Sequence, residues 1–185
     1  MPGNGAIGRL PELLILDREG VLLEHVDPYI LTHDDVRPLA GSLEAVAGFA
    51  SSEVDVAVVT NQSPIGRGLV TRGFVDEVNA MIEQSLAARG VERVAFYVCP
   101  HTPVDGCVCR KPGAGMLEWA AHDAGAMLDR SWMVGDQDSD MLAALTAGCA
   151  QRIQVMSGVQ GQATSHATLV VQDLRALARR CGIGL

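Results

Sequence analysis

Short apolar runs alternate along the chain with segments of helical spacing. The apolar runs predict buried strands at residues 13–16, 54–59, 94–98, 132–134, 153–155 and 169–171. Apolar residues three or four positions apart predict helices at residues 43–50, 74–86, 116–124 and 141–147. Thr71 is placed to cap the second helix and Gly148 to end the fourth. Strands that alternate with helices indicate an α/β fold with a doubly wound, Rossmann-like parallel sheet.

The composition fits one domain. The chain has 185 residues, of which 48% are hydrophobic and 4% aromatic, so it is long enough to bury a single core. We expect this domain to span residues 1–185 and to begin with a flexible tail at residues 1–10. A loop at residues 99–112 interrupts the pattern with Pro, Gly and Cys, and it needs an explanation of its own.

The formal net charge of −8 limits the partners. Nucleic-acid binding depends on a cationic surface, so we expect no nucleic-acid partner. A small anionic substrate is compatible with this charge if Lys, Arg or a bound metal supplies local positive charge. The first residues contain no apolar signal region, and no run is long enough to span a bilayer, which favours a cytoplasmic protein without a membrane partner. We expect a monomer or a weak oligomer.

Polar residues follow three of the predicted strands. Asp17, Thr60 and Asp136 stand at the carboxyl ends of strands, where ligands bind in such sheets. Asp17 and Glu19 place two carboxylates one residue apart, so that one could attack phosphorus while the other transfers protons; an ordinary acidic turn is the alternative. Asp136 and the two aspartates that follow it offer hard oxygen ligands for Mg²⁺, and helix capping is the alternative for the last two.

The order of these motifs resembles that of the haloacid dehalogenase (HAD) superfamily of phosphatases over residues 13–147. The resemblance implies a fold without a separate cap domain and hydrolysis of a phosphomonoester through an aspartyl-phosphate. It implies that Asp17 is the nucleophile and Glu19 the acid/base, and that Thr60 and Lys111 stabilise the phosphoryl oxygens. The Mg²⁺ site that it implies consists of Asp17, the backbone carbonyl of Glu19, Asp136 and, in support, Asp140.

The interrupting loop holds four potential metal ligands within eleven residues: Cys99, His101, Cys107 and Cys109. Three thiolates and one imidazole make the Cys₃His set of a closed zinc site, which leaves no open position for catalysis. Free thiols and a disulfide are the alternatives, and a reducing compartment disfavours the disulfide. Arg110 and Lys111 follow the last cysteine directly, so zinc would fix the loop that presents both cations.

The cysteine-rich loop and residues 60–63 together resemble one branch of the superfamily, which acts on small metabolites. The implied substrate is D-glycero-D-manno-heptose 1,7-bisphosphate, losing its 7-phosphate; histidinol phosphate or another small phosphorylated metabolite is the alternative. Four residues match the substrate site of that branch: Tyr29, Asn61, Arg67 and Arg110. The chain departs from the branch at Glu19, Leu23 and Gln137, where Asp, Asn and Lys are usual. These departures leave a further interpretation open, a non-catalytic protein that binds a phosphosugar.

Overall fold

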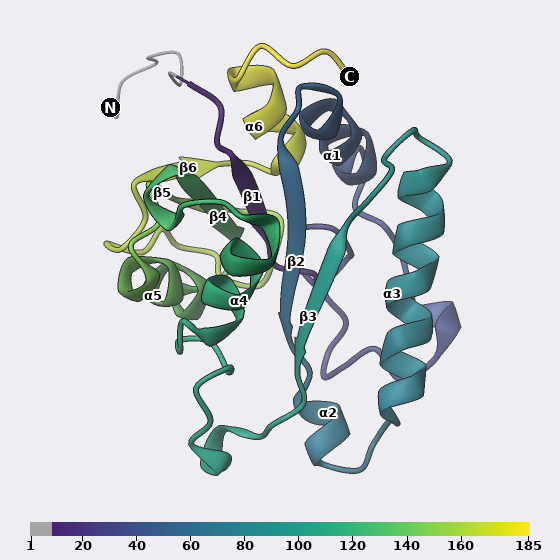
Figure 1. The fold of residues 1–185 in the computed structure, drawn as a ribbon. Helices are drawn as coiled ribbons and strands as arrows, with labels where there is room; N and C mark the ends of the chain where they lie inside the picture. The colour runs from purple at the N-terminus through teal and green to yellow at the C-terminus, as the bar shows by residue number, and fades with distance from the viewer. Residues whose placement is uncertain (1–8) are drawn as a thin grey trace.

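The computed structural model describes residues 9–185, which fold around a six-stranded sheet (Figure 1). The strands are β1 (Leu13–Leu16), β2 (Asp55–Asn61), β3 (Ala95–Cys99), β4 (Ser131–Gly135), β5 (Gln151–Val155) and β6 (Leu169–Val171). They lie in the order β3-β2-β1-β4-β5-β6, and every neighbouring pair is parallel. The predicted doubly wound parallel sheet is confirmed.

β1 lies inside the sheet because its side chains are apolar on both faces. Leu14 and Leu16 join the larger core cluster, and the residues that alternate with them join the smaller cluster on the other face. A strand covered on both faces requires such a continuous apolar run. The register pairs Leu16 with Val58 of β2 and with Val134 of β4. The residues that follow these three strands therefore meet at one edge of the sheet.

Helices cover both faces of the sheet (Figure 1). On the face of the larger cluster lie α1 (Ser42–Ser51), α3 (Arg72–Ala87) and α6 (Leu174–Arg180). The other face is covered by α4 (Gly115–Ala124) and α5 (Asp138–Ala147). The short α2 (Ser63–Gly66) follows β2, and its Gly66 N–H donates to the Pro100 carbonyl at 2.9 Å. The 3₁₀ helices are η1 (His33–Asp35), η2 (Pro103–Asp105) and η3 (Leu128–Arg130).

The helix ends follow the capping chemistry of the sequence. Thr71 Oγ1 accepts a hydrogen bond from Phe74 N at 3.1 Å, and Gly148 ends α5 with a φ of 80°, as predicted. α5 begins three residues before its predicted start because Asp140 completes a capping box with Gln137. Neither α2 nor α6 was predicted from the sequence pattern.

The predicted tail falls largely outside the described part of the chain, which excludes residues 1–8. Leu10, the last residue of the predicted tail at residues 1–10, packs against the larger core cluster. Within residues 9–185 no element folds into a separate cap domain above the carboxyl edge of the sheet. None of the helices of these residues combines the length and the apolar character needed to cross a membrane.

Candidate active site

Three buried aspartates meet at the carboxyl edge of the sheet. Asp17 follows β1, Asp136 follows β4, and Asp140 lies in the first turn of α5. One carboxylate oxygen of each lies within 4.8 Å of the others. This edge lies where the strand order reverses between β1 and β4, which is the usual ligand crevice of such a sheet. Three carboxylates so close and so buried repel one another and require positive charge.

Lys111 supplies part of that charge. Its Nζ lies 2.8 Å from Asp17 Oδ1 and 2.7 Å from Asp140 Oδ1, and it donates to the Val59 carbonyl at 3.0 Å. Burial alone would lower the pKa of Lys111, but the carboxylates of Asp140 and Asp17 raise it above its usual value. The ammonium group is therefore charged at neutral pH.

Asn61 fixes the backbone of Lys111 from the end of β2. The side chain of Asn61 donates to the Lys111 carbonyl and accepts from the Lys111 N–H, both at 3.0 Å. This reciprocal pair positions the lysine so that its ammonium group reaches the aspartates. The sequence suggested a substrate-binding role for Asn61. The residue lines the cavity beside the three aspartates, but its amide is hydrogen-bonded to the protein backbone.

Asp136 is the carboxylate that most clearly fits a cation. Its Oδ2 accepts a hydrogen bond from Val159 N at 2.9 Å, whereas its buried Oδ1 has no hydrogen-bond partner among the described residues. Burial, and then the charge of Asp17, raise the pKa of Asp136 to about 6. A hard divalent cation between Asp17 and Asp136 would satisfy the Oδ1 atom and offset both effects.

Glycines on two loops allow this carboxylate to be enclosed. Gly20, in the turn that follows β1 (the strand-end turn, residues 17–20), has a φ of 83°, and a Cβ there would lie 2.7 Å from the Asp136 carboxylate. A Cβ at Gly158, in the loop between β5 and β6, would collide with the same side chain. Both loops therefore approach Asp136 more closely than any larger residue permits.

Asp140 has the capping role that the sequence offered as an alternative, and it also contacts Lys111. Its Oδ2 accepts from the Gln137 N–H at 3.0 Å as part of the capping box, while its Oδ1 contacts Lys111. Burial raises the pKa of Asp140, and the ammonium group of Lys111 opposes that rise. Asp140 thus ties the start of α5 to the lysine.

Glu19 lies at the wall of the site and belongs to a hydrogen-bond network that was not predicted from the sequence. Arg18 Nε donates to Glu19 Oε1 at 2.7 Å, and Gln62 Nε2 lies 3.1 Å from the same oxygen. Gln62 also donates to Thr60 Oγ1 at 2.8 Å. Arg18 in turn contacts Asn79 of α3. Nothing in the local sequence marks Arg18 or Asn79, because their contact depends on where α3 packs.

A cavity of about 310 Å³ opens beside these groups. Of the residues predicted to act on phosphate or substrate, it is lined by Asp17, Glu19, Tyr29, Thr60, Asn61, Arg110, Lys111 and Asp140. Arg67 is not among its lining residues; it is the C-cap of α2, and its substrate role stays a prediction. His25, Gln137 and Ser139 also line the cavity and were not predicted as substrate contacts.

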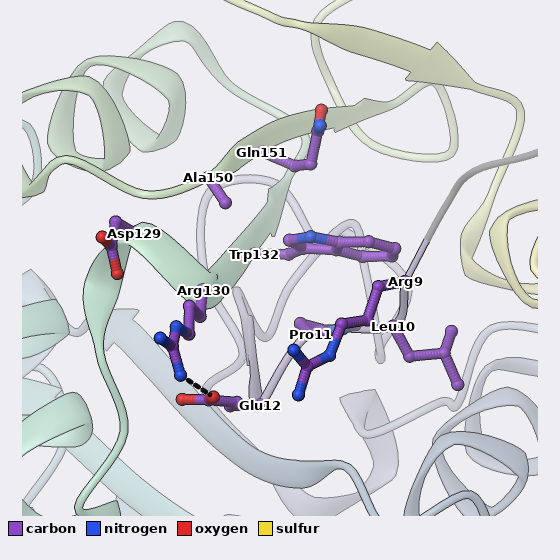
Figure 2. A pocket seen from close by; sticks show the side chains of 9 residues that line it. All are labelled: Arg9, Leu10, Pro11, Glu12, Asp129, Arg130, Trp132, Ala150 and Gln151. Carbon is purple, nitrogen blue, oxygen red and sulfur yellow. Dashed lines mark hydrogen bonds and ion pairs between the residues drawn. The ribbon is translucent and has the colours of Figure 1, made fainter.

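A second cavity, of about 340 Å³, lies at the opposite, amino-terminal edge of the sheet (Figure 2). Its walls come from residues just before and at the start of β1, β4 and β5, including Trp132 of β4 and the ion pair of Arg130 with Glu12 at 2.9 Å. No residue singled out as catalytic, metal-binding or substrate-binding lines it. The residues predicted to be catalytic line the cavity at the carboxyl edge instead.

The four potential ligands of the interrupting loop converge. The three sulfur atoms are 3.3–3.6 Å apart, and His101 Nδ1 lies 3.6 Å from Cys99 Sγ and 3.2 Å from Cys109 Sγ. These sulfur separations exceed a disulfide bond of about 2.05 Å. A tetrahedral site with zinc–sulfur bonds of about 2.3 Å has edges of about 3.8 Å, close to the observed spacing. Cys99, His101, Cys107 and Cys109 can hold one metal ion.

The fold, with its carboxylates and lysine at the carboxyl edge, defines a HAD-like hydrolase of phosphate esters. Residues 108–177 match the family described as HAD-hydrolase-like. The D-glycero-β-D-manno-heptose-1,7-bisphosphate 7-phosphatase of Pseudomonas putida is 39% identical over 173 residues, which cover 91% of this chain and 98% of the relative. The chain belongs to the HAD-like phosphatases, in the family of these heptose-bisphosphate phosphatases.

Solved structures agree with this assignment. The D,D-heptose 1,7-bisphosphate phosphatase of Bordetella bronchiseptica, crystallised with magnesium and phosphate, matches with a TM-score of 0.85 at 34% identity. The match covers 91% of this chain and 97% of that one. The corresponding enzyme of Burkholderia thailandensis matches with a TM-score of 0.67 at 28% identity, over 91% of this chain and 96% of that one.

Proposed function

We propose that the chain hydrolyses a phosphomonoester with Mg²⁺ through an aspartyl-phosphate on Asp17. The observation that carries the proposal is the cluster of Asp17, Asp136 and Asp140, in which Lys111 pairs with Asp17 and Asp140 while the buried Asp136 Oδ1 lacks a hydrogen-bond partner among the described residues. Asp17, Asp136 and the backbone carbonyl of Glu19 would hold Mg²⁺. When bound, the ion supplies positive charge that offsets the charge of the phosphoryl oxygens.

The chain's own residues account for both halves of the reaction. A carboxylate oxygen of Asp17 forms a bond to phosphorus, the bond from phosphorus to the leaving oxygen breaks, and Glu19 donates a proton to that oxygen. In the second half, Glu19 takes a proton from water as the water oxygen bonds to phosphorus. The bond to Asp17 then breaks and phosphate leaves.

Thr60 and Lys111 stabilise charge during both steps. Because Thr60 Oγ1 already accepts from Gln62 Nε2 at 2.8 Å, its hydroxyl proton is available to donate to a phosphoryl oxygen. Lys111 contributes a fixed positive charge beside the nucleophile, 2.8 Å from Asp17 Oδ1. These donors are preorganised, so little rearrangement is needed when charge develops.

For the substrate, we propose the 7-phosphate of D-glycero-D-manno-heptose 1,7-bisphosphate. Support comes from the relatives of 39% and 35% identity that carry this activity in their names. The cavity offers Arg110, beyond the catalytic lysine, as a cation for the second phosphate, and Tyr29 as a polar contact for the sugar. Histidinol phosphate or another small phosphorylated metabolite is the alternative substrate.

Phosphate release from a panel of phosphorylated metabolites, with Mg²⁺ and with EDTA, tests this proposal. We expect Mg²⁺-dependent release of one phosphate from the heptose bisphosphate, and retention of the phosphate at position 1. Release from histidinol phosphate alone would favour the alternative substrate. Tight binding without turnover would favour the non-catalytic phosphosugar-binding protein, and an enzyme fully active in EDTA would contradict the role of Mg²⁺.

We also propose that the Cys/His cluster holds a structural zinc ion. The spacing of the four ligand atoms supports it, as does the link from this loop to the active site. Arg110 Nη1 donates to the His101 carbonyl at 3.2 Å, and Lys111 is the next residue. A metal at this position would hold the loop in the shape that delivers both cations.

A further inference from the structure

Arg18 is a buried cation that the proposed reaction does not use. Its side chain is 1% exposed, although it directly follows the nucleophile. A guanidinium removed from water is strongly unfavourable unless it is paired and hydrogen-bonded. Arg18 meets both needs: Nε and Nη2 each lie 2.7 Å from Glu19 Oε1, and Nη1 donates to Asn79 Oδ1 at 2.8 Å.

The contacts of Arg18 continue into the phosphate site. Gln62 Nε2 lies 3.1 Å and 3.3 Å from the two oxygens of Glu19, and the same amide donates to Thr60 Oγ1. The side chains of Asn79, Arg18, Glu19, Gln62 and Thr60 therefore form one continuous chain from α3 to the cavity. Only Glu19 among them is appreciably exposed, with 26% of its side chain accessible.

This chain of contacts restricts the position of the Glu19 carboxylate. A glutamate has one more rotatable bond than an aspartate, so its carboxylate samples more positions unless neighbours hold it. A displacement of about 1 Å in a reacting group can reduce the rate on the order of a hundredfold. Arg18 holds Oε1 through two donors and Gln62 approaches both oxygens, which leaves the carboxylate one position at the cavity wall.

We propose that Arg18, held in turn by Asn79, is a positioning residue that fixes the carboxylate of Glu19 for proton transfer to the leaving oxygen. This inference rests on the proposed phosphatase function and adds two residues to it. The competing explanation is that the buried pair only joins α3 to the strand-end turn. The two explanations differ in which substrates a variant affects, because only proton transfer depends on the leaving group.

The test compares two phosphate esters in the presence of Mg²⁺. One is the best unactivated sugar phosphate found for the parent protein, whose leaving oxygen needs a proton; the other is p-nitrophenyl phosphate, whose leaving group departs as an anion. The measured quantity is kcat/KM. It depends on the steps up to the transfer of phosphate to Asp17 and does not depend on the later attack of water. The variants are Arg18→Met, Asn79→Leu, Asn79→Asp and Glu19→Gln. Arg72→Met serves as the matched control, because Arg72 pairs with Asp76 on the surface of α3.

We expect Arg18→Met to lower kcat/KM on the sugar phosphate by at least about tenfold, and to change it less than about threefold on p-nitrophenyl phosphate. Asn79→Leu should shift the ratio of the two values in the same direction by a smaller factor. Asn79→Asp keeps an oxygen acceptor for Arg18 and should restore the ratio. Arg72→Met should match the parent on both esters. In the Glu19→Gln background, Arg18→Met should cause no further loss on the sugar phosphate, since the two residues act as one unit.

Equal losses on both esters, or full additivity of Arg18→Met with Glu19→Gln, would overturn the inference while leaving the phosphatase function intact. If Arg18→Met does not fold, as judged by circular dichroism and thermal melting, Asn79→Leu decides the question: an unchanged ratio overturns the inference. A parent protein that releases phosphate from neither ester overturns the proposed function, and the inference with it.

Discussion

Asp17 owes its proposed reactivity to a fixed orientation. Its Oδ1 accepts from Arg18 N at 2.7 Å and contacts Lys111 Nζ at 2.8 Å, so the carboxylate cannot rotate freely. We expect Asp17→Asn to lower turnover by several orders of magnitude, because the amide keeps the size but is not a nucleophile. Phosphate release under saturating Mg²⁺ measures the effect. Asp129→Asn, on the surface at the opposite edge of the sheet, should retain full activity, and near-normal turnover of Asp17→Asn would exclude the covalent mechanism.

At Glu19 the surroundings are adapted to the longer side chain. An aspartate would withdraw the carboxylate by about one methylene from Arg18 and Gln62, which contact it at 2.7 Å and 3.1 Å. We expect Glu19→Asp to be slower on an unactivated ester by about tenfold to a hundredfold. Affinity for Mg²⁺, measured by calorimetry, should stay the same because the proposed ligand is the backbone carbonyl. A faster Glu19→Asp enzyme would show that the neighbours do not require glutamate.

Among the elements, the cysteine-rich loop joins the proposed zinc site to the candidate active site. Its ligands precede Arg110 and Lys111, while most of the large core cluster lies on the other face of the sheet. We expect the parent to contain about one zinc per chain. Cys107→Ser should lose zinc and activity and keep the circular dichroism of the sheet. Cys181→Ser, on a half-buried cysteine just after α6, should keep both. Metal-free protein with full activity would contradict the link.

The loop between β5 and β6 holds the Asp136 carboxylate from the other side. Val159 N donates to Asp136 Oδ2 at 2.9 Å, and Ser157 Oγ donates to the Gly20 carbonyl at 2.7 Å. Gly158→Ala should force this loop away from Asp136, because the added Cβ has no room. We expect affinity for Mg²⁺ to fall by about tenfold, the lower end of what altered support of a metal ligand causes.

Gly161→Ala is the matched control for this loop, since a Cβ at Gly161 meets nothing within 4 Å. Its affinity for Mg²⁺, measured by the same calorimetry, should equal that of the parent protein. Equal affinities of the two alanine variants would show that the loop does not support the metal site.

At the scale of the whole molecule, the sequence predicted a doubly wound parallel sheet because each strand contains a short apolar segment and polar residues follow three of the strands at one edge. α6 was missed although its signals were present: Asp173 caps it by accepting from Ala176 N at 2.6 Å, and Leu174 and Leu177 are buried. α2 has four residues, too few for a periodic pattern.

The convergence of Asp17, Asp136 and the Cys/His cluster could be predicted because these side chains follow a strand or lie in one short loop. The contacts of Arg18 and Gln62 that hold the Glu19 carboxylate could not be predicted. The contact of Arg18 with Asn79 joins residues 61 positions apart, and it exists only because α3 packs against the strand-end turn. Contacts of this kind depend on tertiary packing, which local patterns do not encode.

The active site concentrates negative charge in a chain that is already acidic. Asp17, Asp136 and Asp140 lie together, and Lys111 pairs with the first and the last of them, so the metal-free site carries excess negative charge when all three carboxylates are ionised. The chain as a whole has a formal net charge of −8, which adds a weaker, longer-range repulsion. Protons and Mg²⁺ are alternative ways to reduce this charge, and they should therefore compete.

The competition gives a pH dependence whose sign follows from Asp136. Burial, and then Asp17, raise its pKa from 3.8 to about 6, so the folded metal-free protein holds this proton more tightly than the unfolded chain does. That stabilisation is complete below about pH 3.8 and is lost as the pH rises through about 6. Mg²⁺ binds the ionised form, so the increase in Tm that it causes should be small at pH 5 and grow up to pH 7. Scanning calorimetry in EDTA measures how the Tm of the metal-free protein changes with pH, and the same scans with Mg²⁺ measure the Tm increase. Asp136→Asn should abolish the Tm increase that Mg²⁺ causes. A Tm increase that stays constant from pH 5 to pH 7 would show that Asp136 does not titrate against the metal.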